Sequence, residues 1–289
     1  MKRNSPYWFL LLSGMVLLIQ ATSVHAGRYR DEIFPTVAVT KDIVYGAADS
    51  WDGQPCLLKL DLYQPEGDTA SSRAAIVWIH GGGFVGGDKG EWPFLTLATR
   101  FAKRGYFCVS INYRLVTPSQ FAADPVRSMN EAMYDAKAAV RWLRANAALC
   151  RIDPQRIAIG GGSAGAYTSL HTAYLEEEGS SGSPGYSSEV KAVIDFWGGM
   201  VQYSAMESSE APLMIIHGTA DPIVPFINAQ MLVQQATAVG IPYEFHPLEG
   251  VGHSAWNDME QYITWISPFL YTHVIAKPSI IPCLLLLWE

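Results

Sequence analysis

A serine stands among small residues in the segment 161–165, whose sequence is GGSAG. The apolar run 157–160 precedes it, and a helix-like stretch follows it. A sharp turn between a strand and a helix lifts a serine hydroxyl above a sheet, where it can act as a nucleophile. Small neighbours are needed because the backbone of such a turn approaches other segments closely. We therefore expect Ser163 to be the nucleophile of a covalent reaction.

A second glycine-rich segment, 80–84 (HGGGF), directly follows the strand-like run 76–79. Acyl transfer passes through an oxyanion, which is stabilised by N–H groups already aimed at it. Consecutive glycines let backbone amides turn toward that point, and we expect the donors to be the amides of Gly82, Gly83 and Ala164. A phosphate-binding loop is the alternative, but the Gly-Lys-Ser/Thr ending is missing and the dinucleotide fingerprint does not fit.

The nucleophile needs a general base and an acid that orients the base, expected in the chain order Ser, acid, His. Asp221 comes four residues after the strand-like run 213–217, and His253 follows the last strand-like run, next to a glycine. His253 would accept the Ser163 proton and later give one to the leaving alcohol, while Asp221 would hold the imidazole in the right tautomer. Asp195 is a competing acid, but the pattern places it in the middle of a strand.

The elements that must position these residues alternate along the chain. Strands are predicted at residues 36–45, 56–63, 74–79, 106–113, 156–160, 190–197, 212–217 and 243–248, and helices at 92–104, 124–149, 164–178, 226–239 and 258–274. This alternation indicates a mostly parallel eight-stranded sheet with helices on both faces and an antiparallel entry. Only residues 198–211 separate the sixth strand from the seventh, so we expect a minimal cap over the site.

Composition and charge exclude several classes of protein. The 289 residues are 49% hydrophobic and only 16% charged, which allows a sizeable core and argues against disorder. The formal net charge is -7 and no run of Lys or Arg stands out, so nucleic acid is not an expected partner. None of the cysteines has metal-ligand spacing, and no metal site is expected.

The two ends of the chain differ from the rest. Lys2 and Arg3, the apolar stretch 8–19 and a small-residue site at Ala26 are typical of a secretory signal peptide. The expected division is therefore a signal peptide at 1–26, a catalytic domain at 27–275 and an apolar C-terminal tail at 276–289. Export to the periplasm or the extracellular space follows from this. The tail is too short to span a bilayer. Its open alternatives are packing on the domain, contact with a membrane, contact with another subunit, and a place outside the ordered fold.

An exported protein can form disulfides, and the four cysteines (Cys56, Cys108, Cys150 and Cys283) allow three pairings. Cys108 lies in a strand-like run, where a buried free thiol is expected. Cys56 and Cys150 are the better disulfide candidates. Neither the pairing nor the oligomeric state can be derived from these residues.

Together these segments resemble the α/β-hydrolase superfamily and, within it, the carboxylesterase and hormone-sensitive-lipase-like branch. The resemblance covers roughly residues 36–275 and rests on six segments: 80–84, 112–115 (NYRL), 135–143 (DAKAAVRWL), 161–165 and the loops of Asp221 and His253. It implies hydrolysis of small-molecule carboxylic esters through an acyl-enzyme intermediate, without a cofactor. It also assigns the nucleophile, acid and base roles to Ser163, Asp221 and His253.

Two features depart from the hormone-sensitive-lipase-like pattern. That branch typically has Asp or Glu where this chain has Gly162, and its long N-terminal cap is missing here. Exported esterases with short caps, including enzymes that act on plant-wall acyl esters, are therefore alternative relatives. A serine peptidase or amidase and a catalytically silent binding protein are the alternative functions on the same scaffold. Against them, no large peptide-selecting segment is found and no residue of the triad is missing.

Aromatic residues in or beside these loops could line a substrate pocket, with ordinary core packing as the alternative for each. The candidates are Phe84, Tyr167, Trp197 and Trp256. Trp256 is the strongest because it follows His253 by three residues. An open site with aromatic walls favours small to medium acyl chains or aryl esters.

Overall fold

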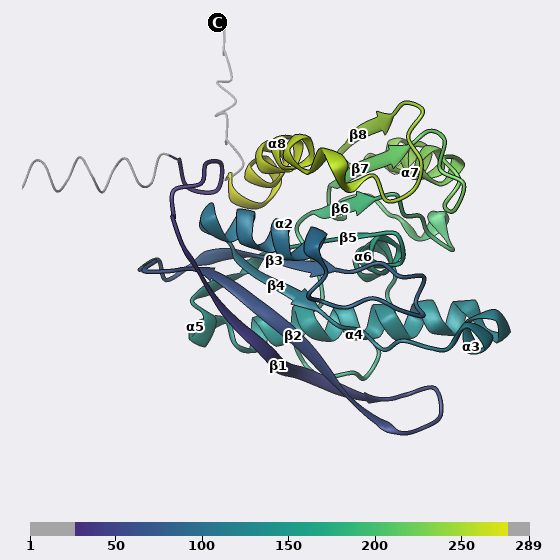
Figure 1. The fold of residues 1–289 in the computed structure, drawn as a ribbon, viewed down its shortest axis with the longest axis horizontal. Coiled ribbons are helices and arrows are strands. Elements are labelled where there is room, and N and C mark those ends of the chain that lie inside the picture. Colours follow the sequence, from purple (N-terminus) through teal and green to yellow (C-terminus); the bar gives the residue numbers. More distant parts are fainter. Residues whose placement is uncertain (1–26, 277–289) are drawn as a thin grey trace, which may run out of the picture.

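The eight apolar runs form one sheet in the computed structural model, which describes residues 27–276 (Figure 1). The strand order is β1-β2-β4-β3-β5-β6-β7-β8, with β2 antiparallel to both of its neighbours and β3 to β8 parallel. The strands are β1 (Val37–Asp49), β2 (Pro55–Pro65), β3 (Arg73–Ile79), β4 (Phe107–Ile111), β5 (Ile152–Gly162), β6 (Val193–Phe196), β7 (Leu213–Gly218) and β8 (Tyr243–Leu248). The expected fold class is thereby confirmed.

The helices begin and end where local chemistry allows. They are α2 (Trp92–Lys103), α3 (Pro118–Ala123), α4 (Pro125–Ala145), α5 (Ala147–Cys150), α6 (Ala164–Tyr174), α7 (Ile227–Val239) and α8 (Met259–Leu270), which continues into the single π-turn η3 (Tyr271–Ile275). α4 begins at a proline, and the Asp124 side chain caps it by accepting from the Arg127 amide at 2.9 Å. These bounds divide the single helix predicted at 124–149, because Asn146 leaves the helical conformation.

The helix after Ser163 ends earlier than predicted, at Tyr174 instead of Glu178. Leu175 is extended, and its carbonyl accepts a hydrogen bond from the Lys137 ammonium. Arg141 binds the backbone carbonyl of Glu178 at 2.8 Å, so side chains of α4 hold this segment outside the helix. Lys137 and Arg141 thus bind carbonyls of the segment that follows the helix.

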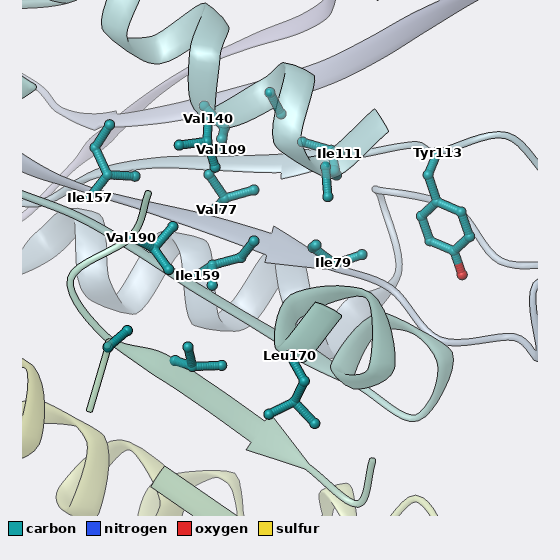
Figure 2. Packing of buried hydrophobic residues seen from close by; sticks show 14 of the residues in the cluster. Val77, Ile79, Val109, Ile111, Tyr113, Val140, Ile157, Ile159, Leu170 and Val190 are labelled. Atoms are coloured by element: carbon teal, nitrogen blue, oxygen red, sulfur yellow. The ribbon is translucent and has the colours of Figure 1, made fainter. Parts of the chain in front are cut away.

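Alternate residues of the central strands face two different cores. On β3, Val77 and Ile79 belong to the core beneath α4, α6 and α7, whereas Ile76 and Trp78 belong to the core beneath α2 and α8. Figure 2 shows Val77 and Ile79 beside Ile159 of β5 in the first of these cores. Burying one such side chain contributes about 1.5–3 kcal/mol, so the two cores together fix the position of β3 and β5.

The carboxyl ends of β3, β5, β7 and β8 meet at one edge of the sheet, where loops of parallel sheets carry functional groups. Between β6 and β7 the chain forms only the single turn η1 (Tyr203–Ala205), so the minimal cap is as expected. Among the described residues, no helix is long and apolar enough to cross a membrane. The signal peptide predicted at 1–26 and the tail residues 277–289 lie outside the described residues.

The disulfide expectation is wrong for the cysteines that the structure describes. Cys56, Cys108 and Cys150 are free thiols. Burial raises the pKa of the Cys108 thiol, as is usual for a sulfur packed among apolar side chains. Cys283 lies outside the described residues.

A buried ion pair ties the antiparallel entry to the main sheet. Asp135 of α4 is fully buried and binds the Arg114 guanidinium at 2.9 Å and the Arg114 amide at 2.8 Å. Arg114 in turn donates to the carbonyl of Asp49 at the end of β1 and to that of Glu131 on α4. One side chain therefore joins three segments, and it depends on Asp135 for its charge balance.

Replacing that carboxylate should destabilise the protein strongly. Asp135→Ala leaves the buried guanidinium of Arg114 without its partner, and we expect the free energy of unfolding to fall by about 3–5 kcal/mol. Urea unfolding followed by tryptophan fluorescence measures this. The control is Asp31→Ala, at an exposed aspartate, which should change stability by less than about 0.5 kcal/mol. Equal losses in the two variants would contradict the role given to the ion pair.

Candidate active site

Ser163 occupies a strained turn between β5 and α6. Its backbone has φ 55° and ψ -118°, outside the regions that side-chain-bearing residues favour, and its amide donates to the Phe196 carbonyl at 2.9 Å. The turn also brings α6 close to β3. A Cβ at Gly165 would lie 2.2 Å from the carbonyl oxygen of Ile79, so only glycine fits there.

A continuous chain of hydrogen bonds leads away from the serine hydroxyl. Nε2 of His253 lies 2.9 Å from Oγ of Ser163, and Nδ1 lies 2.7 Å from Oδ2 of Asp221. The other oxygen of Asp221 accepts from the amides of Ile223 and Val224 at 2.8 and 2.9 Å. The structure thus brings together the three residues that the chain order suggested. Two backbone donors hold the carboxylate while it contacts the imidazole.

His217 lies beneath this group but does not replace His253. Its Nε2 contacts the Val224 carbonyl at 2.8 Å and lies 3.5 Å from Oδ2 of Asp221. Burial lowers the pKa of His217, which favours the neutral imidazole. A neutral Nε2–H donor supports the loop that carries Asp221.

Asp195, the competing acid, occupies a different environment. It is fully buried in β6, and its Oδ1 accepts from the Gly198 amide at 2.8 Å, while its Oδ2 has no partner among the described residues. Burial raises its pKa to about 7, against the smaller lowering effect of that hydrogen bond. Its carboxyl makes no contact with His253. Instead it holds the turn at Trp197, whose φ is 48°.

The loop after β3 presents unpaired amides beside the serine. Gly82 and Gly83 have φ of 99° and 62°, and among the described residues their amides donate to no protein acceptor. Ala164 is the first residue of α6, so its amide is one of the unpaired donors at the helix start. These are the three donors expected from the sequence.

Aromatic and polar side chains hold the glycine loop 80–84 in place. The ring of Tyr113 stacks on His80 at 4.5 Å between centroids, and its hydroxyl donates to the Gly81 carbonyl at 3.0 Å. Burial lowers the pKa of His80, so the neutral form is favoured. Asn112 donates to Asp88 at 2.8 Å and accepts from the Lys89 amide. The sequence segment 112–115 therefore acts by fixing the shape of the glycine loop.

A pocket of about 320 Å³ opens onto Ser163. Its lining residues are Gly81, Gly82, Gly83, Glu91, Phe94, Gly162, Ser163, Trp197, Ile223, His253, Ser254 and Trp256. Among them are Trp197 and Trp256, two of the four aromatic residues expected to line it.

The other two aromatic candidates lie elsewhere, which corrects the expectation for Phe84 and Tyr167. The left-handed backbone of Phe84, with φ of 65°, turns its ring into the core, where it stacks on Phe121 at 5.7 Å between centroids. Tyr167 lies on α6 with its ring against His171 and is not among the lining residues. A position next to a functional loop in the sequence does not show in which direction the side chain points.

Glu91, Phe94, Ile223 and Ser254 line the pocket but were not singled out from the sequence. For Glu91 and Phe94 a signal existed, because the helix beginning at Trp92 directly follows the glycine loop. For Ile223 the signal was its distance of two residues from Asp221. From the sequence alone, the larger aromatic residues nearby are the more obvious candidates for the pocket wall.

The pocket wall explains why the residue before Ser163 is glycine. A Cβ at Gly162 would lie 2.8 Å from Cζ2 of Trp256. The Trp256 ring cannot move away freely, since it packs against Phe94, Phe196 and Trp197 with centroid distances of 5.4, 5.0 and 4.6 Å. The indole of Trp256 therefore fills the space that an acidic side chain at residue 162 would need.

With this geometry established, the chain can be compared with known proteins. The BD-FAE family model matches residues 60–210, slightly more than half of the chain. The chain belongs to the BD-FAE family. A model of the prolyl oligopeptidase family also matches residues 191–271. Membership of the α/β-hydrolase superfamily, in its carboxylesterase and hormone-sensitive-lipase-like branch, is confirmed.

Several curated relatives of this BD-FAE protein are hydrolases. It is 41% identical over 112 residues to a phenmedipham hydrolase of Pseudarthrobacter oxydans, a match that covers 38% of this chain and 22% of that protein. It is 28% identical over 183 residues to a probable carboxylic ester hydrolase of Mycobacterium tuberculosis, covering 62% of this chain and 38% of that protein. The chain thus spans about a fifth to two fifths of the length of these relatives.

Among solved structures, esterase 2 of Thermogutta terrifontis is similar to the BD-FAE protein over most of both chains. In its native form the TM-score is 0.69 with 26% sequence identity, and the match covers 89% of this chain and 99% of the esterase. The same esterase has been solved with butyrate or propionate bound and after phosphonylation by sarin.

No cluster of three or more His, Cys, Asp or Glu side chains that could hold a metal ion is found within residues 27–276. The polar groups around the pocket are instead arranged around Ser163. They can transfer a proton between Ser163 and His253 and can bind a developing anion at the glycine loop.

The contact between Gly162 and Trp256 generates a test by double substitution. We expect Gly162→Ala to destabilise the protein by about 1–3 kcal/mol, because a methyl group is forced into the indole. In the Trp256→Ala background the same substitution should cost much less, because the clash is gone. Urea unfolding of the four proteins measures the coupling. Gly86→Ala is the control, since a Cβ there meets no atom within 4 Å. Equal costs in both backgrounds would refute the contact.

Burial of Asp195 should make stability depend on pH. Its pKa rises from 3.8 to about 7 on folding, so the folded protein binds the proton more tightly than the unfolded chain does. The stabilisation is fully present below about pH 4 and is lost as the pH rises through about 7. We expect the stability of wild type relative to Asp195→Asn to fall across this range, measured by urea unfolding at each pH. Asp31→Asn is the exposed control, and a pH-independent difference for Asp195→Asn would be inconsistent with this assignment.

Proposed function

We propose that the protein is a serine carboxylesterase that hydrolyses small to medium carboxylic esters through an acyl-enzyme intermediate. The observation that carries the proposal is the hydrogen-bonded series Asp221, His253 and Ser163, with 2.7 and 2.9 Å between successive groups. It ends at the pocket that also contains the glycine loop. The hydrolase relatives and the similar esterase from Thermogutta terrifontis support the same reaction class.

In the proposed mechanism, Oγ of Ser163 attacks the ester carbonyl carbon while Nε2 of His253 takes the hydroxyl proton. Asp221 accepts from the Nδ1–H of the imidazole and stabilises the imidazolium that forms. The carbonyl oxygen becomes an oxyanion that accepts from the amides of Gly82, Gly83 and Ala164. His253 then gives its proton to the departing alkoxide, which leaves as the alcohol.

The second half of the reaction uses the same groups on water. His253 takes a proton from a water molecule, whose oxygen attacks the acyl carbon. The tetrahedral intermediate collapses, and Oγ of Ser163 leaves with the proton returned by His253. The products are the carboxylic acid and the regenerated serine, so no oxidant, reductant or cofactor is required.

Pocket size supports the proposed substrate range. A cavity of about 320 Å³ with walls formed by Phe94, Trp197 and Trp256 accommodates a short acyl chain or an aryl group. The similar esterase from Thermogutta terrifontis binds propionate and butyrate. We further propose that the protein is exported, based on the signal-peptide features of residues 1–26.

A peptidase is the second candidate, because the prolyl oligopeptidase family model matches residues 191–271, the segment that includes Asp221 and His253. The ester and amide reactions share the triad, so the substrate decides between them. A panel of peptidyl amides cleaved faster than matched esters would favour the peptidase.

Ser163→Ala tests the proposed function directly. We expect hydrolysis of an aryl acetate, followed by release of the phenol, to fall by at least roughly 10³-fold, since the nucleophile is removed. Ser169→Ala is the matched control, because Ser169 lies on the same helix and its hydroxyl donates to the Gly165 carbonyl instead. Undiminished hydrolysis by Ser163→Ala would rule out the serine esterase mechanism.

A further inference from the structure

The pocket beside Ser163 carries an uncompensated negative charge. Among its lining residues in the described part of the chain, Glu91 is the one carboxylate, and none is lysine or arginine. The remaining walls are backbone, small hydroxyl groups, His253 and apolar side chains. A substrate bound at Ser163 therefore lies close to an acidic group with no cationic counterpart in the same wall.

Local structure holds Glu91 at this position. It is the residue before the first turn of α2, and its carboxylate accepts from the Asp88 amide at 3.2 Å. The helix and the glycine loop thus meet at this side chain. Phe94, one turn into the same helix, lines the pocket next to it.

The neighbouring basic residue does not neutralise this charge. The ammonium of Lys89 points away to bind Asp61 at 3.0 Å and Asp42 at 3.1 Å, and its side chain is nearly buried. Asp88 adds a second carboxylate, which binds Asn112 and the Gly90 amide. Asp88 does not line the pocket, so Glu91 is the acidic side chain of this segment that a bound substrate meets.

The side chain of Glu91 is exposed, and part of the pocket wall beside it is aromatic. Trp256 and Trp197 pack edge to face and line the same pocket as Glu91. Charges interact more strongly where apolar walls focus the field. Aromatic faces also attract cations and offer nothing to anions.

We propose that Glu91 is a specificity-determining residue that makes the site accept neutral and cationic esters and disfavour esters that carry an anionic group. This inference rests on the proposed esterase function. In this inference, Glu91 selects between esters by repelling anionic ones as well as by attracting cationic ones.

The test uses three aryl esters. In each, three methylene groups join the ester carbonyl to a different end group. The chains end in a tert-butyl, a trimethylammonium or a carboxylate group, so the first two are nearly equal in shape and differ in charge. A second series places the same end groups on the alcohol of an acetate, because substrate extends from Ser163 in both directions. The readout is the ratio of kcat/KM between the neutral or cationic ester and the anionic one.

Glu91→Gln is the informative variant, since a glutamine oxygen can still accept from the Asp88 amide. In wild type we expect the anionic ester to be hydrolysed roughly three- to tenfold less efficiently than the neutral one in at least one series. Glu91→Gln should remove most of this ratio. Raising the ionic strength should reduce the ratio in wild type but not in Glu91→Gln, which separates a charge effect from a change of shape.

Glu66→Gln is the matched control, because Glu66 is exposed and follows β2 at the opposite edge of the sheet. It should leave every ratio at the wild-type value. Ester hydrolysis that depends on Ser163 but shows the same ratios in wild type and Glu91→Gln overturns the inference alone. Absence of Ser163-dependent hydrolysis of the neutral esters overturns the proposed function and the inference with it.

Discussion

The close approach of the Ser163 turn to β3 is the constraint on which the rest of the site depends. A backbone with φ of 55° at a serine is unfavourable by itself and persists only where the surroundings hold it. Here β5 is paired with β3 on one side and β6 on the other, and Gly165 lies against the Ile79 carbonyl. Because Ile79 is followed at once by the glycine loop, the same packing fixes the distance between Ser163 and the amides of that loop.

Much of this arrangement could be predicted because it follows the periodicity of buried strands. The runs that became β3, β5 and β7 are short, apolar and bounded by glycine or proline, and their ends locate the serine, the aspartate and the glycine loop. His253 could be placed because it follows the last strand beside a glycine. Strand ends of a parallel sheet converge at one edge, so chain order was sufficient to bring these residues together.

Other features could not be predicted because they depend on the direction in which a loop side chain points. Phe84 follows three glycines, yet a left-handed backbone turns it into the core. Glu91 is an unremarkable residue in the sequence, and its place in the pocket results from how α2 is joined to the glycine loop. The break at Asn146 likewise interrupts a continuous helical pattern of apolar residues. Sequence periodicity contains no information on these local backbone angles.

The short connection between β6 and β7 also bears on what can limit the rate of turnover. Many enzymes must open and close a cover in each cycle, and that motion can limit turnover. Residues 198–212 between these strands do not line the pocket beside Ser163 and are too few to act as such a cover, and Ile223 of the pocket wall is 68% exposed. The pocket therefore opens to solvent without a movable cover from this connection. If Ser163 reacts as we propose, a substrate whose remote part is bulky, even one attached to a polymer, can leave that part in solvent.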